Sequence, residues 1–321
     1  MTRILITATY DPKPESTKLM GAEDRTGRPA QSPDVPMVRI LADSATRFRG
    51  MSTRAIDTGA EAAEQFWRDG FCVLRSVVSA DTLAAASAAV DALPSAELAD
   101  LSALAGDSGG ARFRAGVDHW RTHPAFEALA TEGILPALAA AVLRSERVWL
   151  YEDSVLVKEP GSEVSTKWHT DDGYFHVEGR QLATMWVPLD PAPLSAGALR
   201  FMPGSHATER RYRPTLFVTD DPIPGTDGDA PPDHTIDHPS TVGYDLEVGD
   251  LTIHHARTLH AASGNATATT RRALSIRYCG DDAVVRPKPG APPKPGFDAI
   301  EPGTPLREVA AQLGLVEAVL R

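Results

Sequence analysis

The distribution of apolar and polar residues divides the chain into a polar start, a helical stretch and a longer β-rich part. Residues 1–55 show no sustained period of either kind and predict a weakly ordered N-terminal leader. In residues 56–145, segments rich in Ala and Leu predict mainly α-helix. Gly70 follows the first of these segments as a stop signal, and Ser79 precedes the next one as an N-cap.

In residues 146–285 the pattern changes to short segments rich in β-branched and aromatic residues, with turn signals between them. These segments are VWLYEDSVLVKE, QLATMWVPLD, GALRFMPG, DLTIHHARTLH and RALSIRYCG. Many short strands without intervening helices are typical of an antiparallel barrel or jelly roll. The pattern therefore predicts a mainly β core with flanking α-helices.

Two further segments stand apart from the strands. Residues 213–245 are rich in Asp, Pro, Gly and Thr and predict a long loop insertion. A long loop inside a compact domain is either a binding lid or an insertion without function, and the pattern favours neither. Residues 286–321 begin as a Pro-rich connector, and Pro305 to Leu320 predicts a short amphipathic helix that docks on the body.

Composition and charge narrow the classes of function. The 321 residues carry a net charge of −11, which disfavours nucleic acid as a partner and leaves a small-molecule substrate. Cys72 and Cys279 lie outside any metal-binding spacing and predict reduced thiols. Because no apolar run approaches the length of a membrane helix and no signal-peptide pattern is present, we expect a cytoplasmic protein without membrane contact. The oligomeric state is not indicated.

The stretch WHTDDGY contains the strongest candidate chemistry. On a strand, alternate side chains share a face, so His169 and Asp171 are expected to point the same way. A second histidine from a distant strand would complete a two-His-one-carboxylate face, the arrangement of non-haem Fe(II) oxygenases. Since an isolated His-x-Asp pair occurs by chance in many chains, the downstream residues decide the interpretation.

Downstream, the segment GDLTIHHARTLHAASGN supplies three candidates for the distant histidine. They are His254, His255 and His260. The next predicted strand begins with Arg271 and Arg272. An arginine that faces the same interior could bind a cosubstrate carboxylate through two parallel hydrogen bonds.

The ordered set of motifs resembles the phytanoyl-CoA dioxygenase family of Fe(II)/2-oxoglutarate oxygenases, from about Phe66 to Gly280. The motifs are DGFCVLRSVVS, LVKEPG, WHTDDGY, MWVPLD, GALRFMPGSH, GDLTIHHARTLHAASGN and RRALSIRY. The resemblance implies a double-stranded β-helix, a jelly roll of the cupin type with flanking helices. It also implies that residues 56–285 form the oxygenase domain.

The resemblance also assigns residues to the site. His169, Asp171 and His260 match the family's iron ligands, and His260 is preferred over its neighbours because it has the family's spacing to Arg271. Arg271 matches the arginine that binds 2-oxoglutarate. Positions that line the cosubstrate pocket in some members correspond to Lys158, Trp186 and Ser275, with Arg277 as a further candidate for substrate or cosubstrate contact.

The cofactors implied are Fe(II), 2-oxoglutarate and O2, with ascorbate as a stimulant, and the products include succinate and CO2. Asp171 favours hydroxylation of an unactivated C–H, because related halogenases have a small residue at that position. Desaturation, epimerisation and ring closure are alternatives within the family. A cupin-type isomerase without oxygenase activity and a non-enzymatic interaction protein are alternatives outside it.

Residues outside the motifs receive weaker interpretations. Substrate contacts are expected from three variable segments, residues 110–123, 174–181 and 213–245. The other histidines are interpreted without a role in chemistry: His176 as a surface residue, His206 as a local structural residue, His234 and His238 as solvated, and His119 and His123 as residues without a partner pattern.

Overall fold

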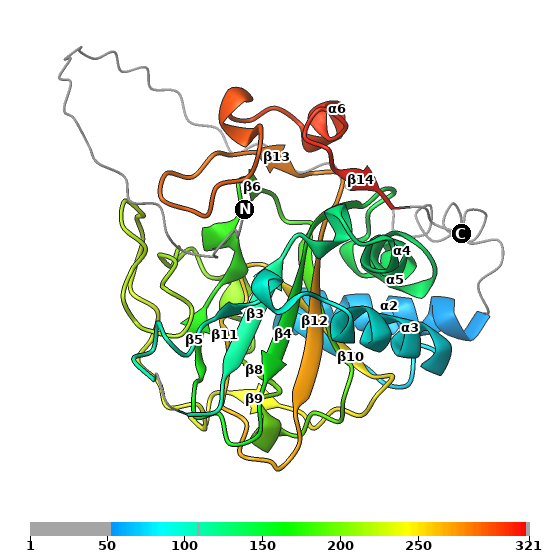
Figure 1. The fold of residues 1–321 in the computed structure, drawn as a ribbon. Coiled ribbons are helices and arrows are strands. Elements are labelled where there is room, and N and C mark those ends of the chain that lie inside the picture. Colours follow the sequence, from blue (N-terminus) through cyan, green and yellow to red (C-terminus); the bar gives the residue numbers. More distant parts are fainter. Residues whose placement is uncertain (1–52, 108–109, 319–321) are drawn as a thin grey trace.

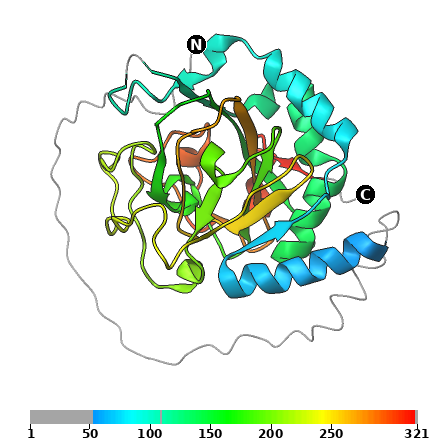
Figure 2. The same cartoon turned by 90° about the horizontal axis from the view of Figure 1, so that it is seen from below.

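The computed structural model describes residues 53–107 and 110–318 (Figure 1). The predicted leader, residues 1–55, therefore lies outside the described residues, except that its last three positions begin helix α2. A group of helices lies along one side of a β core. Figure 2 shows these helices covering that side of the strands. The mainly β fold with flanking helices is confirmed.

The larger sheet is antiparallel at every strand pairing among the described residues, and the helices pack against it. Its strand order is β1 (Phe71–Leu74), β10 (Leu251–His255), β7 (Leu182–Pro188), β12 (Arg271–Cys279), β4 (Trp149–Lys158), β3 (Phe113–Val117) and β2 (Ala99–Asp100), with β14 (Val316–Glu317) also paired to β4. The central strands β12 and β4 run side by side over their whole length, with one bulge after Arg277.

A smaller sheet faces the larger one and completes the jelly roll. It consists, in order, of β5 (Thr166–His169), β11 (His260–Ala262), β8 (Leu199–Phe201) and β9 (Val242–Gly243). A separate pair joins β13 (Val284–Val285) to β6 (Val177–Glu178). The predicted loop insertion, residues 213–245, is irregular apart from isolated bridges and β9.

The helices begin and end largely where the sequence signals lie. They are α2 (Thr53–Asp69), α3 (Ala80–Asp91), α4 (Pro124–Thr131), α5 (Ile134–Leu143) and α6 (Leu306–Val309). Gly70 ends α2 with φ +90°, and the Ser79 hydroxyl accepts the Thr82 N–H at 3.2 Å as the N-cap of α3. Helices α4 and α5 are separate because Gly133 takes a positive φ between them.

Alternation along β12 explains how one strand serves both a core and a site. Leu274 and Ile276 face the helices and are 1% exposed within the largest hydrophobic cluster. Burying each such side chain stabilises the fold by about 1.5–3 kcal/mol. Ser275 and Arg277 lie on the opposite face and line a cavity between the two sheets. The outer face therefore holds the helices in place, and the inner face is available for chemistry.

The end of the chain differs from the prediction. The helix expected from Pro305 to Leu320 is wrong, because only Leu306–Val309 is helical and the chain then pairs with β4 as β14. Gly314, with φ +63°, turns the chain into that pairing.

Within the described residues, no single helix is long and apolar enough to cross a membrane. Helices α4 and α5, which are bent by 42° relative to each other, have the length and composition of a membrane-spanning segment only when they are taken together.

The Pro-rich connector lies against the rim of the barrel. The Lys294 ammonium is 2.8 Å from a carboxylate oxygen of both Asp118 and Glu152. The His176 ring is buried beneath the connector, 2.9 Å from the Pro292 carbonyl, and accepts the Lys288 N–H at its other nitrogen. The interpretation of His176 as a surface residue is therefore wrong, because the connector covers it.

Candidate metal centre and cosubstrate pocket

The three predicted iron ligands come together in the interior. Each offers one ligand atom, and these atoms all lie within 4.8 Å of one another. His169 is the last residue of β5 and His260 the first of β11, and the two are direct partners in the antiparallel register. Their ring centres are 4.1 Å apart. The small sheet thus holds both imidazoles, and all three side chains are buried.

Asp171 reaches the histidines by a different route from the one that strand alternation suggested. Strand β5 ends at His169, and Asp171 begins the 3₁₀ turn η3 (Asp171–Tyr174). The next amide, of Asp172, donates to the Ala256 carbonyl at 3.0 Å and fixes this turn. Asp171 Oδ1 then lies 3.8 Å from Nε2 of both His169 and His260. The turn, and not the pleat of a strand, therefore positions the carboxylate.

Backbone carbonyls orient both imidazoles. His169 Nδ1 is 2.8 Å from the Lys167 carbonyl, and His260 Nδ1 is 2.9 Å from the Thr258 carbonyl. An Nδ1–H that donates to a carbonyl leaves the Nε2 lone pair free for a metal. Burial, with a neighbouring histidine, lowers the pKa of His169 to about 3 and that of His260 to about 4. Both rings are therefore neutral at neutral pH, the form that binds a metal.

The other oxygen of Asp171 is held by two further side chains. Thr184 Oγ1 donates to Oδ2 at 2.5 Å, and His254 Nε2 lies 3.3 Å from the same atom. Burial opposes ionisation of Asp171, but the hydrogen bond from His254 and the nearby His260 lower its pKa well below the usual value. The carboxylate is consequently charged, with Oδ1 directed to the two ligand histidines.

The position of His254 was not foreseen from the sequence, where it was weighed only as a replacement ligand. Its inward orientation follows from strand β10, where His254 pairs in register with Thr184. His255 points to the other face, where its ring lies 5.4 Å from the ring of His206. His206 itself is buried and contacts the distant Trp67 carbonyl at 3.3 Å, so its structural role is not a local one.

We expect His254→Phe to weaken iron binding by roughly 10- to 100-fold without abolishing it, because partners of metal ligands contribute that much in other sites. Iron affinity measured by competition with a chelator tests this. Thr252→Val is the matched control on the same strand. The Thr252 hydroxyl is buried and has no hydrogen-bond partner in the described part of the chain, so its loss should leave iron affinity unchanged. An unaltered iron affinity in His254→Phe would show that Thr184 alone orients Asp171.

A pair of buried cations lies in the central strands of the larger sheet. Arg271 and Lys158 are register partners and are 2% and 0% exposed. Within the described ranges, neither has a carboxylate within 4.0 Å. The Arg271 guanidinium donates to the carbonyls of Ala196 (3.2 Å) and Leu156 (3.4 Å), and Lys158 Nζ donates to that of Ser263 at 2.5 Å.

The charge of this pair is destabilised by its surroundings. Burial lowers the pKa of Arg271 to about 10. Burial, and secondarily the charge of Arg271, lowers the pKa of Lys158 well below its usual value. Isolated charges in a protein interior are expensive unless an opposite charge compensates them. The pair is therefore suited to an anionic ligand with a carboxylate.

The cavity between the two sheets connects the triad to Arg271. Its volume is about 30 Å³, and residues of both sheets line it, including Trp186, Ser275, Arg271 and Arg277. Lys158 is not among the lining residues and lies behind Phe113, 4.6 Å from the centre of that ring. Of the predicted cosubstrate residues, the structure thus brings Trp186, Ser275 and Arg271 together at the cavity.

The two remaining arginines of β12 are already paired. Arg277 lines the cavity but forms an ion pair with Glu152 at 3.0 Å. Arg272 faces outward, where it contacts Asp190 and Asp91, each at 2.7 Å. Arg271 is consequently the arginine of this strand whose charge is left for a ligand.

Aromatic side chains from two of the three predicted substrate segments also line the cavity. Phe113 belongs to residues 110–123, and Phe217 belongs to the loop insertion. The Phe217 ring stands edge-on to His169 at 5.0 Å, and the backbone of Phe217 has φ +68°. A bulky residue in this conformation is strained, by about 1–3 kcal/mol. The loop therefore places an aromatic ring directly beside the candidate metal ligands.

Two histidines and one carboxylate in the interior of a jelly roll are the arrangement found in mononuclear non-haem iron centres. A family model described as phytanoyl-CoA dioxygenase (PhyH) matches residues 66–273. The chain belongs to the phytanoyl-CoA dioxygenase family, which confirms the resemblance of its motifs.

Two curated relatives agree with this relation. "Phytanoyl-CoA dioxygenase 1" of Oryza sativa subsp. japonica is 25% identical over 134 residues, 42% of this chain and 46% of the relative. A "Probable alpha-ketoglutarate-dependent hypophosphite dioxygenase" of Stutzerimonas stutzeri is 29% identical over 149 residues, 43% of this chain and 47% of the relative. The match thus spans less than half the length of either relative.

Solved structures share the fold over a larger part of the chain. The epimerase SnoN, in complex with Fe3+, alpha ketoglutarate and nogalamycin RO, is 27% identical with a TM-score of 0.60, covering 79% of this chain and 96% of its own. The carbocyclase SnoK from nogalamycin biosynthesis is 21% identical with a TM-score of 0.57, covering 81% of this chain and 95% of its own, and supports the fold alone.

Proposed function

We propose that this protein is an Fe(II)- and 2-oxoglutarate-dependent oxygenase that oxidises an unactivated C–H of a small molecule. The observation that carries the proposal is the combination of two features in one interior. A buried triad of His169, Asp171 and His260 lies at the same cavity as the buried guanidinium of Arg271, which has no carboxylate partner within the described ranges. Family membership supports the same conclusion.

The residues of the triad fit an iron ion. Both imidazoles have Nδ1 engaged with carbonyls, so two Nε2 atoms and Asp171 Oδ1 converge from one side. Two neutral nitrogens and one carboxylate would hold the ion and leave part of its surroundings open to a chelating cosubstrate and O2. When bound, Fe(II) would supply the activation of O2 and the oxidation of a C–H bond.

Other residues would bind and orient 2-oxoglutarate. Arg271 can form two parallel hydrogen bonds with the far carboxylate, while Lys158, its register partner, lies behind it. Trp186 and Ser275 line the space between Arg271 and the triad. The apolar rings of Phe113 and Phe217 would exclude water around the reacting centre. Succinate and CO2 would be the products of the cosubstrate.

Hydroxylation is the first candidate for the outcome, because Asp171 occupies the position that related halogenases leave small. Epimerisation is the second candidate, and the 27% identity and TM-score of 0.60 to the epimerase SnoN favour it. The two outcomes differ in mass: a hydroxylated product gains one oxygen atom, whereas an epimer has the mass of its substrate.

The proposed activity is tested by incubating purified protein with Fe(II), ascorbate and 2-oxoglutarate in air. Succinate should form, and a screen of small metabolites should find one whose consumption accelerates its release. Mass spectrometry of that metabolite then separates hydroxylation from epimerisation. A cupin-type isomerase, the main alternative, would bind the metal yet release no succinate with any compound.

Phe217 offers a test of the substrate pocket. We expect both Phe217→Ala and Phe217→Gly to weaken substrate binding, measured as a higher KM, because both remove the ring beside His169. Gly accepts a positive φ that Ala does not, so the Gly variant should unfold at a higher temperature than the Ala variant. Equal KM values in the two variants would assign the effect to the ring. Wild-type KM values in both would remove Phe217 from the pocket.

A further inference from the structure

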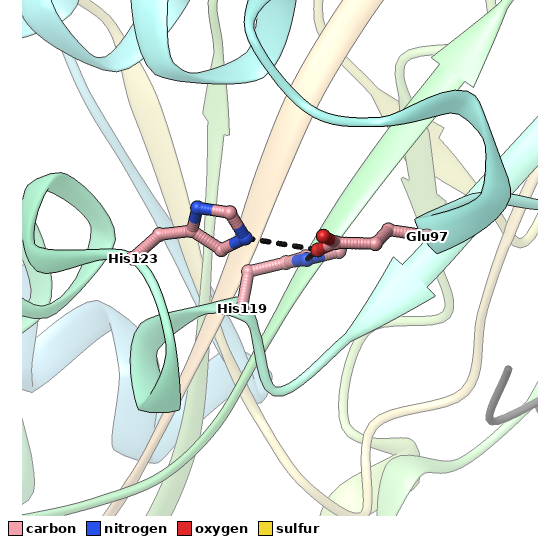
Figure 3. Close-up of side chains that lie close together, drawn as sticks. All are labelled: Glu97, His119 and His123. Atoms are coloured by element: carbon pink, nitrogen blue, oxygen red, sulfur yellow. Dashed lines mark hydrogen bonds and ion pairs between the residues drawn. The ribbon is translucent and has the colours of Figure 1, made fainter. Parts of the chain in front are cut away.

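Three side chains outside the iron centre form a second cluster of metal-binding groups. Figure 3 shows the rings of His119 and His123 next to the Glu97 carboxylate, with a dashed line from the carboxylate to each histidine. Glu97 Oε2 lies 2.9 Å from His123 Nε2 and 3.4 Å from His119 Nδ1. The interpretation of these histidines as residues without a partner is therefore wrong, because their partner comes from a part of the chain more than twenty positions away.

The backbone brings the two histidines to one side. His119 begins the 3₁₀ turn η2 (His119–Arg121), and His123 is the N-cap of α4. The His123 N–H donates to the His119 carbonyl at 2.9 Å, which closes one helical turn. Residues four apart on such a turn lie on the same face. Both rings therefore face Glu97, the last residue of η1 (Ser95–Glu97).

A glycine on the adjacent strand makes room for the cluster. A Cβ atom on Gly116 of β3 would lie 2.3 Å from the Glu97 carbonyl oxygen and 2.6 Å from His119 Nε2. Real Cβ atoms essentially never approach that closely, so any other residue at position 116 would displace Glu97 or His119. The absence of a side chain is what lets η1 and η2 meet over β3.

From these contacts we propose that Glu97, His119 and His123 bind a zinc ion. Two imidazoles and one carboxylate are a known ligand set of four-coordinate zinc, with water in the fourth position. Tetrahedral ligands about 2.0–2.2 Å from zinc lie roughly 3.3 Å from one another. The two distances from Glu97 Oε2 to the histidine nitrogens are close to this value, and all three ligand atoms lie within 4.8 Å of one another. Calcium and magnesium prefer sites made wholly of oxygen atoms, so the two nitrogens favour zinc.

The site is separate from the iron centre and has access to solvent. None of its three residues lines the cavity between the sheets. The Glu97 and His123 side chains are 37% and 31% exposed, whereas His119 is 3% exposed. Water can thus reach the fourth position from the Glu97 side. A bound ion would cross-link η1 to the start of α4 and stabilise the contact between them. It would take no part in the oxygenase reaction.

Zinc binding is measured by equilibrium dialysis of metal-free protein against Zn2+. Because two histidines and one carboxylate at the iron centre would also bind zinc, the double variant His169→Ala/Asp171→Ala serves as the background. We expect two zinc ions per chain for the wild type and one for the background. Adding Glu97→Gln or His123→Gln to the background should weaken the remaining site by at least about tenfold, since loss of even an indirect partner weakens metal sites that much.

His238→Gln is the matched control, because His238 also lies next to a second histidine, with its ring 4.1 Å from that of His234. It should leave zinc binding unchanged. In the otherwise wild-type chain, His123→Gln should reduce the stoichiometry from two to one and leave succinate formation unaltered, which separates this site from the proposed oxygenase activity. The proposal is overturned if the background binds no zinc, or if its zinc is insensitive to Glu97→Gln and His123→Gln.

Discussion

Asp171→Ala is expected to abolish iron binding and to lower succinate formation by at least about 1,000-fold, equivalent to about 4 kcal/mol of lost stabilisation. Asp171 is the only carboxylate of the triad, and Oδ1 lies 3.8 Å from both ligand nitrogens. Without it, two neutral imidazoles would face a divalent cation with no negative charge to compensate it. Metal analysis of the dialysed protein and a succinate assay measure the two effects.

Asp172→Ala is the matched control for this prediction. Asp172 is adjacent in the sequence, and its backbone N–H and carbonyl, not its carboxylate, hold the turn: the N–H donates to Ala256 and the carbonyl accepts from Lys288. The Ala variant keeps both backbone contacts, so iron content and succinate formation should stay near the wild-type level. If both variants lost iron and succinate formation equally, the effect would come from disruption of the turn and not from loss of the ligand Asp171.

Arg271→Gln is expected to weaken binding of 2-oxoglutarate by roughly 30-fold or more while iron binding persists. Removing one partner of a buried charge pair costs about 2 kcal/mol or more, which corresponds to that factor. The apparent KM for 2-oxoglutarate, with iron content as the second readout, tests the assignment. Arg272→Gln is the control, because Arg272 faces outward to Asp190 and Asp91 and should leave this KM unchanged.

The melting temperature of the Arg271→Gln variant distinguishes a ligand-binding arginine from a structural one. Among the described residues, the Arg271 guanidinium forms hydrogen bonds only with carbonyl groups. Its buried charge therefore destabilises the protein in the absence of 2-oxoglutarate. We expect Arg271→Gln to melt no lower than the wild type without cosubstrate, and to lose most of the stabilisation that 2-oxoglutarate gives the wild type. A variant that melts much lower in both conditions would make Arg271 a structural residue.

The central elements of the fold could be predicted because their signals are local. Period-two segments such as RALSIRYCG place Leu274 and Ile276 against helices and Ser275 inside, whatever the partner strand is. Helix caps are predictable for the same reason, because they are local: the Ser79 hydroxyl accepts a hydrogen bond from the amide three residues later. The C-terminal helix was mispredicted because this segment can form either a helix or a strand paired with β4. The pairing with β4, which is distant in the sequence, decides between the two.

The ligand triad could be predicted by motif, although the physical reason offered for Asp171 was wrong. Alternation assumes that the strand continues, and the sequence does not show that β5 ends at His169. Residues around the triad depend on contacts far apart in the chain. His254 meets Asp171 across 83 positions, and His119 meets Glu97 through a gap left by Gly116. No local pattern marks such partners.

The most direct test of the oxygenase centre is iron-dependent turnover of 2-oxoglutarate by the wild-type protein in air. We expect succinate to form with Fe(II), to stop when a chelator removes the metal and to resume when Fe(II), but not Zn2+, is restored. Zinc can bind to the same ligands but has no redox chemistry, so Zn2+ should not restore succinate formation. Failure of Fe(II)-loaded protein to release succinate with any compound of the metabolite screen would contradict the account.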